Sequence, residues 1–293
     1  MNSNQEPQLS KPTEFPGQHQ NQQPGIQSGM VPEPLTMDND YKGSGKMDGM
    51  VAVITGGDSG IGRAAAAAFA KEGADVVIAF YNEQEDAVET ARLVECAGKK
   101  CILVNCDLKQ EAAAQQVVDQ AIQNFGHIDV LVNNVAVQFP QNNVESITAE
   151  QLKTTFETNI FSAFYMTKAV MPHLKPGASI INTASVTAYQ GSPTLIDYSA
   201  TKGAMVSFTR SLALSVISKG IRVNAVAPGP VWTPLIVSSF PEDRVAQFGQ
   251  DVPMGRAAQP AELAPAYVYL ASKDSSYVTG QVLHVNGGVI VGS

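Results

Sequence analysis

The sequence predicts an α/β protein with a doubly wound, mostly parallel seven-stranded sheet, and three observations support this prediction. Short apolar runs alternate with helix-forming segments between about residues 50 and 285. Most of these runs are apolar throughout, as expected for strands that are covered on both faces. A glycine-rich turn follows the first run. Right-handed crossovers then arrange such a chain as one sheet with helices on both sides.

The boundaries follow from where the apolar runs begin and where turn-forming residues interrupt them. Strands are predicted at VAVIT (51–55), DVVIAF (75–80), CILVN (101–105), IDVLVN (128–133), ASIINT (178–183), IRVNAVA (221–227) and QVLHV (281–285). Helices are predicted at 63–73, 84–98, 109–125, 148–171, about 198–219 and 260–271. The first three end at or just before a glycine, which commonly stops a helix.

Residues 1–45 differ from residues 46–293, which form the predicted single domain. They are rich in Gln, Asn and Pro and nearly lack apolar periodicity, so they cannot bury enough surface to fold alone. Two alternatives are open for them. They form either a disordered tail or an extended arm that packs on the main domain or on a neighbouring subunit. Scattered apolar residues could anchor such an arm: Phe15, Ile26, Met30, Val31, Leu35 and Tyr41.

The composition argues against several functional classes. A formal net charge of -8 gives no electrostatic basis for binding nucleic acid or an acidic membrane. No run of about 18 apolar residues could span a bilayer, and the N-terminus has no apolar signal segment. The expected location is therefore the cytoplasm. No metal site is expected, because the Cys and His residues fit no common ligand spacing: Cys96, Cys101, Cys106, His19, His127, His173 and His284.

The turn TGGDSGIG (55–62) points to a nucleotide, because it lies between the first strand and the first helix. Gly56 allows a tight turn, Gly60 lets the backbone approach a pyrophosphate, and Gly62 lets helix and strand pack closely. The helix N-terminus then offers unpaired N–H groups to the phosphates. The alternative is a glycine-rich turn without a ligand. A P-loop is excluded, since no Gly-Lys-Ser/Thr follows.

The TGxxxGxG spacing resembles the short-chain dehydrogenase/reductase family, whose fold is of the Rossmann type, over about residues 48–290. Three further motifs agree: CDL (106–108), NNVA (133–136) in place of the family's usual NNAG, and APGPVWTP (227–234). The resemblance implies that Asp107 contacts the adenine and that Thr233 helps to hold the nicotinamide. The implied cofactor contacts are Gly56, Asp58, Ser59, Gly60, Ile61, Gly62, Phe80, Tyr81, Asp107, Leu108, Asn133, Val135, Ala136, Tyr198, Lys202, Pro228, Gly229, Val231 and Thr233.

Asn159, Ser185, Tyr198 and Lys202 match the family's catalytic set in order and spacing. The resemblance implies that Tyr198 is the general acid or base, that Ser185 holds the substrate oxygen, and that Asn159 supports a water beside Lys202. It also implies that Lys202 binds the nicotinamide ribose. Residues four apart share a helix face, so Lys202 should lie beside Tyr198. Its ammonium is expected to favour the phenolate and to lower the pKa of Tyr198.

Cofactor preference stays open, and both NAD and NADP are candidates. An acid at the end of the second strand would favour NAD, whereas a basic residue there or before the middle glycine would favour NADP. The sequence has Phe80, Tyr81 and Asn82 at the first place and Ser59 at the second. Asp58 would repel a 2′-phosphate if it faced one.

A substrate pocket is expected from Ser185, Val186, Gln190 and Tyr198. Its other walls are expected from Tyr189, Pro193, Leu195, Gln138, Phe139 and a mobile lid at 231–250. These mixed apolar and amide side chains favour a small carbonyl or alcohol substrate over a charged acid.

The chain also resembles bacterial general-stress oxidoreductases, which share a Gln/Pro-rich extension, GGDSGIGRAAA and QPAELAPAYVYLAS (259–272). That resemblance implies a homotetramer whose extensions embrace neighbouring subunits. Two other functions stay open. One is a catalytically silent NAD(P)-binding stress or regulatory protein, which would not need the intact catalytic set. The other is an epimerase or dehydratase, whose chains usually carry a separate substrate domain.

Overall fold

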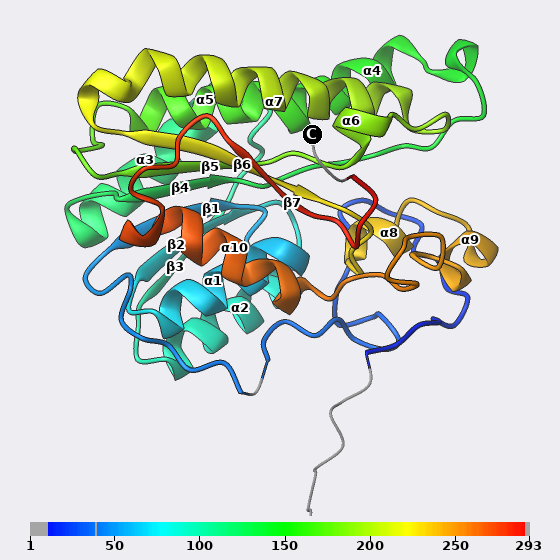
Figure 1. The fold of residues 1–293 in the computed structure, drawn as a ribbon, viewed down its shortest axis with the longest axis horizontal. Helices are drawn as coiled ribbons and strands as arrows, with labels where there is room; N and C mark the ends of the chain where they lie inside the picture. Colours follow the sequence, from blue (N-terminus) through cyan, green and yellow to red (C-terminus); the bar gives the residue numbers. More distant parts are fainter. Residues whose placement is uncertain (1–10, 39, 291–293) are drawn as a thin grey trace, which may run out of the picture.

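The computed structural model describes residues 11–38 and 40–290, and within them a seven-stranded parallel sheet forms the centre of the molecule (Figure 1). The strand order is β3-β2-β1-β4-β5-β6-β7, and each neighbouring pair is parallel. The order reverses between β1 and β4, which is the point where open α/β sheets bind ligands. The strands are β1 (Val51–Thr55), β2 (Asp75–Phe80), β3 (Cys101–Asn105), β4 (Val130–Asn133), β5 (Ser179–Thr183), β6 (Arg222–Pro228) and β7 (Val282–Val285).

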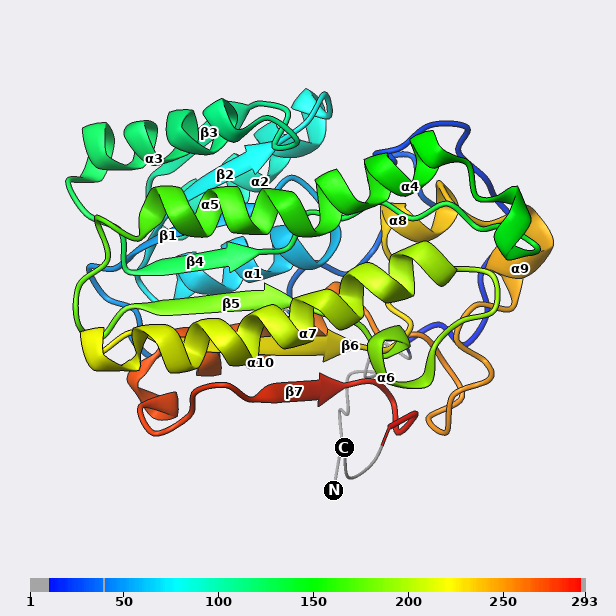
Figure 2. The same cartoon turned by 90° about the horizontal axis from the view of Figure 1, so that it is seen from above.

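Helices cover both faces of the sheet, which confirms the predicted doubly wound class. Figures 1 and 2 show α3, α5 and α7 on one face and α1, α2 and α10 on the other. The helices are α1 (Gly60–Lys71), α2 (Gln84–Cys96), α3 (Glu111–Phe125), α4 (Ala149–Phe156), α5 (Ser162–Val170), α6 (Thr187–Gln190), α7 (Ile196–Val216), α8 (Pro234–Val237), α9 (Glu242–Ala246) and α10 (Pro260–Ala271).

The core lies in two layers because successive side chains of a strand point to opposite faces. On β1, Ala52 and Ile54 pack with residues of α1 and α10, whereas Val53 packs with residues of α3 and α5. All five residues of β1 are buried. A strand of this kind needs apolar residues at every position, which is why the uninterrupted apolar runs predicted the sheet correctly.

The segment predicted as one helix at 148–171 contains an irregular turn. Its middle, Glu157–Phe161, is a π-helix between α4 and α5, and Asn159 lies within it. Such wide turns often occur at functional sites. The segment 231–250, predicted as a lid, carries the short helices α8 and α9.

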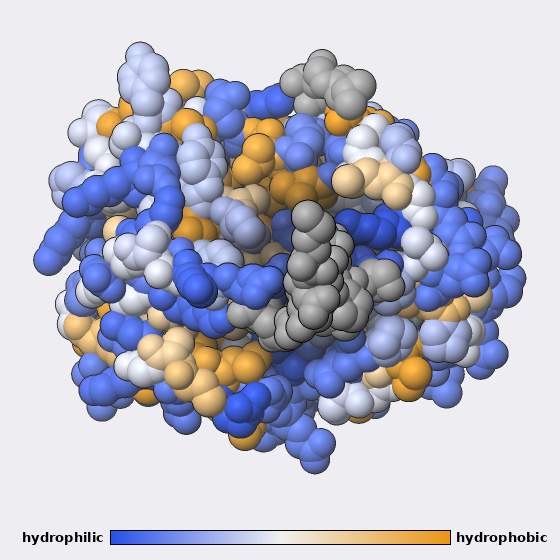
Figure 3. Space-filling view, turned by 60° about the horizontal axis from the view of Figure 1, so that its bottom comes forward, coloured by the Kyte–Doolittle hydropathy of each residue, from blue (hydrophilic) through white to orange (hydrophobic). Residues whose placement is uncertain are grey.

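The described part of the N-terminal arm lies along the surface of its own domain, as the blue segment in Figure 1 shows. The ring of Phe15 stacks on Trp232, with 3.7 Å between ring centroids. The amide of Leu35 donates to Oε1 of Gln259 before α10, and the Tyr41 hydroxyl donates to Glu72 after α1. The lower side of the molecule is largely hydrophilic, with separate apolar patches (Figure 3).

Short 3-10 turns complete the chain at Val144–Ser146, Ile217–Lys219 and Lys273–Ser275. In the part of the chain that the structure describes, no helix combines the length and apolar character needed to cross a membrane. Within the same residues, no three His, Cys, Asp or Glu side chains gather as a metal site would require.

Candidate active site

A cavity of about 980 Å³ opens at the carboxyl ends of the strands. Its floor includes Gly56 after β1, Phe80 at the end of β2, Asp107 after β3 and Thr183 at the end of β5. Most of the residues that the sequence predicted as site residues line this one cavity. They are Gly56, Asp58, Ser59, Gly60, Ile61, Phe80, Tyr81, Asp107, Leu108, Val135, Ala136, Ser185, Val186, Gln190, Tyr198, Lys202, Pro228, Gly229, Val231 and Thr233.

Gly62 and Asn133, predicted as cofactor contacts, do not line the cavity. A Cβ on Gly62 would lie 1.9 Å from the carbonyl oxygen of Gly56, so this glycine serves the close packing of helix and strand. The side chain of Asn133 is buried and donates to Oδ1 of Asn182, 2.9 Å away. Asn133 is the last residue of β4, and its side chain points toward β5. This hydrogen bond therefore joins the two strands and does not face the cavity.

The glycine turn has the backbone geometry that a phosphate cradle needs. Gly56 and Gly60 have φ of +61° and +52°, in the left-handed region that favours glycine. A Cβ on Gly60 would lie 3.0 Å from Cγ2 of Thr233, across the groove. The first amides of α1 have no intrahelical acceptor. The residues present therefore fit the pyrophosphate of a dinucleotide, which the amide of Ile61 would help to hold.

Asn134 is a site residue that the sequence prediction did not include among the cofactor contacts. Its side-chain amide donates to the carbonyl oxygens of Thr55 and Gly56, at 3.2 and 3.0 Å. Its backbone amide donates to Oγ1 of Thr55. Asn134 therefore fixes the glycine turn and also lines the cavity. The NN pair in the sequence was the available signal, but pattern alone could not tell which Asn faces inward.

Ser185, Tyr198 and Lys202 meet at one end of the cavity, although they come from the end of β5 and from α7. Ser185 is hydrogen-bonded to the Tyr198 hydroxyl. Nζ of Lys202 lies 5.5 Å from the centroid of the Tyr198 ring and donates to the carbonyl oxygen of Thr183 at 2.7 Å. The four-residue spacing on α7 places the tyrosine and the lysine side by side, as the helix repeat requires.

Asn159 lies behind this group, outside the cavity lining. Its side chain accepts from the amide of Val137 at 2.8 Å and donates to the carbonyl of Val137 at 2.9 Å. It also donates to Oγ1 of Thr201, which adjoins Lys202 in the chain. Asn159 thus ties the loop after β4 to α7, and the π-helix turn brings it to that position.

The protonation states of the pair differ from the sequence-based expectation. Burial raises the pKa of Tyr198 to about 12, and the hydrogen bond from Ser185 opposes this shift. Burial lowers the pKa of Lys202 to about 7. The expected lowering of the tyrosine pKa is therefore wrong for this state of the protein. Desolvation disfavours both charges, and a lysine whose pKa is lowered to about 7 keeps only part of its charge at neutral pH with which to stabilise a phenolate.

The part of the cavity at the ends of β2 and β3, where the sequence predicted the adenine, contains a buried acid. Asp58 is 5% exposed, and burial raises its pKa to about 6. Asn82 follows β2 with φ of +67°, so the chain turns sharply after Tyr81. Lys109 also lines the cavity, and its Nζ lies 3.5 Å from the carboxylate of Asp107. This end therefore holds one buried acid and a lysine that already has an acidic neighbour.

The lining of the predicted substrate pocket differs from the prediction at one residue. Gln138, Phe139, Pro193 and Leu195 line the cavity as expected, together with much of the segment 231–250. Tyr189 does not, because its ring packs edge-on against His284. The N-terminal segment Asn21–Gly25 lines the cavity as well. Sequence reasoning missed it, since a Gln-rich stretch carries no periodic pattern.

The family comparison agrees with this geometry. A family model described as enoyl-(acyl carrier protein) reductase matches residues 56–290. The chain is 60% identical over 271 residues to the uncharacterized oxidoreductase YhdF of Bacillus subtilis, covering 92% of this chain and 94% of that protein. It is 55% identical to general stress protein 39 of the same organism, covering 96% and 98%. It is 53% identical to the glucose and ribitol dehydrogenase of Daucus carota, covering 95% and 98%.

Solved structures share the fold. One is a 3-ketoacyl-(acyl-carrier-protein) reductase from Brucella melitensis complexed with NADH, with a TM-score of 0.75 and 36% identity over 83% of this chain and 98% of that chain. Another is a short chain dehydrogenase from Burkholderia cenocepacia in complex with NADP, with a TM-score of 0.77 and 26% identity over the same shares.

Proposed function

The chain belongs to the short-chain dehydrogenase/reductase family, and we propose that it interconverts an alcohol and an aldehyde or ketone by hydride transfer with NAD or NADP. One observation carries this proposal. The glycine turn and the group formed by Ser185, Tyr198 and Lys202 line the same cavity. A dinucleotide held by its pyrophosphate at the turn would have its other end free to extend toward Tyr198.

Tyr198 is the proposed general acid for carbonyl reduction. With a pKa of about 12 it carries its proton at neutral pH, so it can give that proton to a carbonyl oxygen as a hydride reaches the carbon. Ser185 would hold the same oxygen beside Tyr198. Lys202 is proposed to contact the cofactor ribose and to exchange protons with Tyr198. The nicotinamide, when bound, supplies or accepts the hydride.

In the oxidative direction Tyr198 would be the base, and it must first lose its proton. An oxidised nicotinamide carries positive charge, which would favour the phenolate and oppose the effect of burial. Reduction at neutral pH has no such requirement. At neutral pH we therefore expect the protonation state of Tyr198 to favour reduction of the carbonyl over oxidation of the alcohol.

An uncharged, oxygen-rich substrate fits the cavity best. Uncharged amides and hydroxyls dominate its polar lining near Ser185, including Gln138, Thr187, Gln190 and Ser192. Within the described residues, Nε2 of Gln138 is buried without a hydrogen-bond partner, and a substrate oxygen could accept from it. The relative from carrot is described as acting on glucose and ribitol. We therefore include sugars and polyols among the proposed substrates.

We also propose a homotetramer located in the cytoplasm. Large apolar side chains remain exposed on the π-helix, α5, α7 and the 3-10 turn that follows α7: Phe161, Phe164, Leu214 and Ile217. Such side chains favour a contact with further copies of the chain. Light scattering after size-exclusion chromatography would report the mass directly, and a monomer at micromolar concentration would contradict the tetramer.

The alternative is an NAD(P)-binding stress or regulatory protein without turnover. Fluorescence titration with NADH and NADPH, followed by a screen of aldehydes, ketones, sugars and polyols, separates the two. Tyr198→Phe should abolish turnover and leave cofactor affinity within about twofold, because the phenol ring remains while the proton donor is lost. Full activity in that variant would refute the proposed acid. Cofactor binding without turnover of any substrate would favour the alternative.

A further inference from the structure

The N-terminal arm forms part of the cofactor cavity, although it lies outside the residues that the family model matches. The match to the family begins at residue 56. Asn21–Gly25 nevertheless line the cavity together with Gly60 and Thr233. These three parts of the chain lie next to the groove in which a pyrophosphate would sit. The arm therefore makes one wall of a site whose other walls come from the common fold.

Hydrogen bonds hold this part of the arm against both sides of the cavity. The amide of Gln20 donates to the carbonyl of Val237 on α8, 2.7 Å away. The Gln23 side chain pairs with the backbone of Gln138 in both directions, donating to its carbonyl and accepting from its amide. The segment from Gln20 to Gln23 thus joins the substrate-side helix α8 to the loop after β4.

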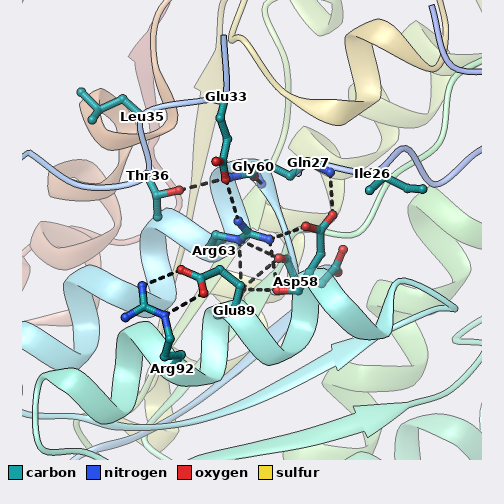
Figure 4. A network of polar contacts seen from close by, with 12 residues as sticks. Ile26, Gln27, Glu33, Leu35, Thr36, Asp58, Gly60, Arg63, Glu89 and Arg92 are labelled. Carbon is teal, nitrogen blue, oxygen red and sulfur yellow. Dashed lines mark hydrogen bonds and ion pairs between the residues drawn. The ribbon is translucent and has the colours of Figure 1, made fainter. Parts of the chain in front are cut away.

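Gln27 connects the arm to the glycine turn itself (Figure 4). Its side chain is 0% exposed, and its Oε1 accepts from the backbone amide of Gly60 at 2.7 Å. Its own backbone amide donates to Oδ2 of Asp86 at 2.6 Å, and its Nε2 donates to Oγ1 of Thr36. One arm residue is therefore fixed to both α1 and α2.

A buried ion pair extends this network under the turn. Arg63 and Asp86 are 1% and 2% exposed, and the guanidinium lies 2.8 Å from the carboxylate. Nε of Arg63 also donates to the carbonyl oxygen of Asp58 at 2.8 Å. The carboxylate of Glu33, an arm residue, lies 3.6 Å from the Arg63 guanidinium. Figure 4 shows Glu33, Asp58 and Arg63 close to Gly60 at the start of α1. The arm thereby contacts the turn through Gly60 directly and through Arg63 indirectly.

The start of α1 needs an acceptor that its own sequence does not supply. Among the described residues, Ser59 at the cap position makes no side-chain hydrogen bond to the helix. Gln27 provides that acceptor for the first amide, at Gly60. The next amide, at Ile61, which lines the cavity, is left for an anion, since the first turn of a helix has no internal acceptors. An amide oxygen is neutral, so it caps the helix without repelling a pyrophosphate.

We propose that Gln27 is a positioning residue for the dinucleotide, and that the arm segment 20–27 closes over the bound cofactor and slows its release. The inference rests on the proposed function, because it assumes that NAD or NADP occupies the cavity. Gln27 sets the direction of the first amides of α1, and the wall formed by Asn21–Gly25 must open locally before the cofactor leaves.

Gln27→Met tests this directly, since methionine has a similar length and no amide. Affinity for the tighter-binding of NADH and NADPH is measured by fluorescence, and its release rate by stopped-flow displacement. The dissociation constant should rise about tenfold, mainly through faster release, as expected when a buried donor loses its acceptor. Tyr41→Phe is the matched control. It removes an arm contact to Glu72 that lies away from the cavity, and cofactor release should be unchanged.

Unchanged or tighter cofactor binding by Gln27→Met would overturn the proposal, and tighter binding would identify Gln27 as a competitor for the Gly60 amide. Equal weakening in both variants would also overturn it, since any loosening of the arm would then have the same effect. A second measurement needs no variant. Hydrogen exchange at residues 20–27 of the unchanged protein should slow on cofactor addition, and no change there contradicts the closure. If neither cofactor binds at all, the proposed function itself fails.

Discussion

Replacing Phe15 with alanine should detach the first part of the arm and expose the single tryptophan of the chain. Phe15 is 5% exposed and stacks on Trp232 with an angle of 5° between the rings. Trp232 is 0% exposed, and its ring N–H donates to the carbonyl of Pro32 at 2.9 Å. Two separate arm residues therefore cover this one side chain.

The expected magnitude follows from the buried area. A phenylalanine side chain buries about 150–250 Å² in all, which at ~25 cal/mol per Å² is worth roughly 4–6 kcal/mol as an upper bound. Losses of about 3–5 kcal/mol are typical when a core phenylalanine becomes alanine. The aromatic stacking supplies about 0.5–1.5 kcal/mol of this in typical pairs. A docked arm segment that loses about 3 kcal/mol should open more than a hundredfold more often.

The assay uses Trp232 as the reporter. Acrylamide quenching of tryptophan fluorescence should increase, and the emission should move to longer wavelength, while the melting temperature of the main domain falls by only a few degrees. Tyr277→Ala is the control, because that aromatic side chain is fully exposed and is not part of the proposed subunit contact. An acrylamide quenching constant for Phe15→Ala equal to that of the wild-type protein would refute the stacking. A wild-type quenching constant that rises on dilution would show that the arm belongs to a neighbouring subunit.

Two further predictions concern buried charges. Asp58→Asn should stabilise the protein at pH 7.5, by at most ~3 kcal/mol, because the acid's pKa rises from 3.8 to about 6 on folding. The free-energy cost of the buried charged Asp58 is complete above about pH 6 and absent below pH 3.8. Thermal melts should therefore show the variant as more stable at pH 7.5 but not at pH 4. A higher stability at both pH values would contradict burial of the charge as the cause. Lys202→Met should be more stable than the unchanged protein at pH 7, by at most ~5 kcal/mol, because burial lowers the lysine pKa from 10.5 to about 7. That advantage should shrink as the pH rises from about 7 toward 10.5, and an advantage that grows with pH would count against it.

The sheet and its helices could be predicted from the sequence because strand burial leaves a direct pattern. Every strand lies within about two residues of its predicted bounds, for example Val130–Asn133 within the predicted 128–133. The cavity lining could be predicted as well, since motif positions at the ends of parallel strands meet at one edge. The direction in which each side chain points was harder to predict from the sequence. Asn133 and Asn134 are adjacent, yet one points into the sheet and the other toward the glycine turn.

The arm is the part that composition described least well. Few apolar residues and many amides predicted that it could not fold alone, which stays a prediction about an isolated segment. Its amides instead bond to backbone groups of the main domain, as Gln23 does at Gln138 and Gln27 does at Gly60. The partners of these side chains are set by the fold, 115 and 33 residues away in the sequence. No local pattern in the arm could have shown them.

The Tyr198 and Lys202 pair shows why a correct motif can suggest the wrong electrostatics. Spacing on α7 determines that the two side chains are neighbours, and the structure agrees. Whether the neighbour carries charge depends on burial, which the spacing does not contain. Both side chains are less than 10% exposed, so at neutral pH the tyrosine is a phenol, while the lysine, with a pKa of about 7, is divided between amine and ammonium. A phenol is the form needed to protonate a carbonyl oxygen. The burial that makes the tyrosine a poor base without cofactor thus prepares it as an acid, and an incoming positive charge on the nicotinamide is what would reverse that role.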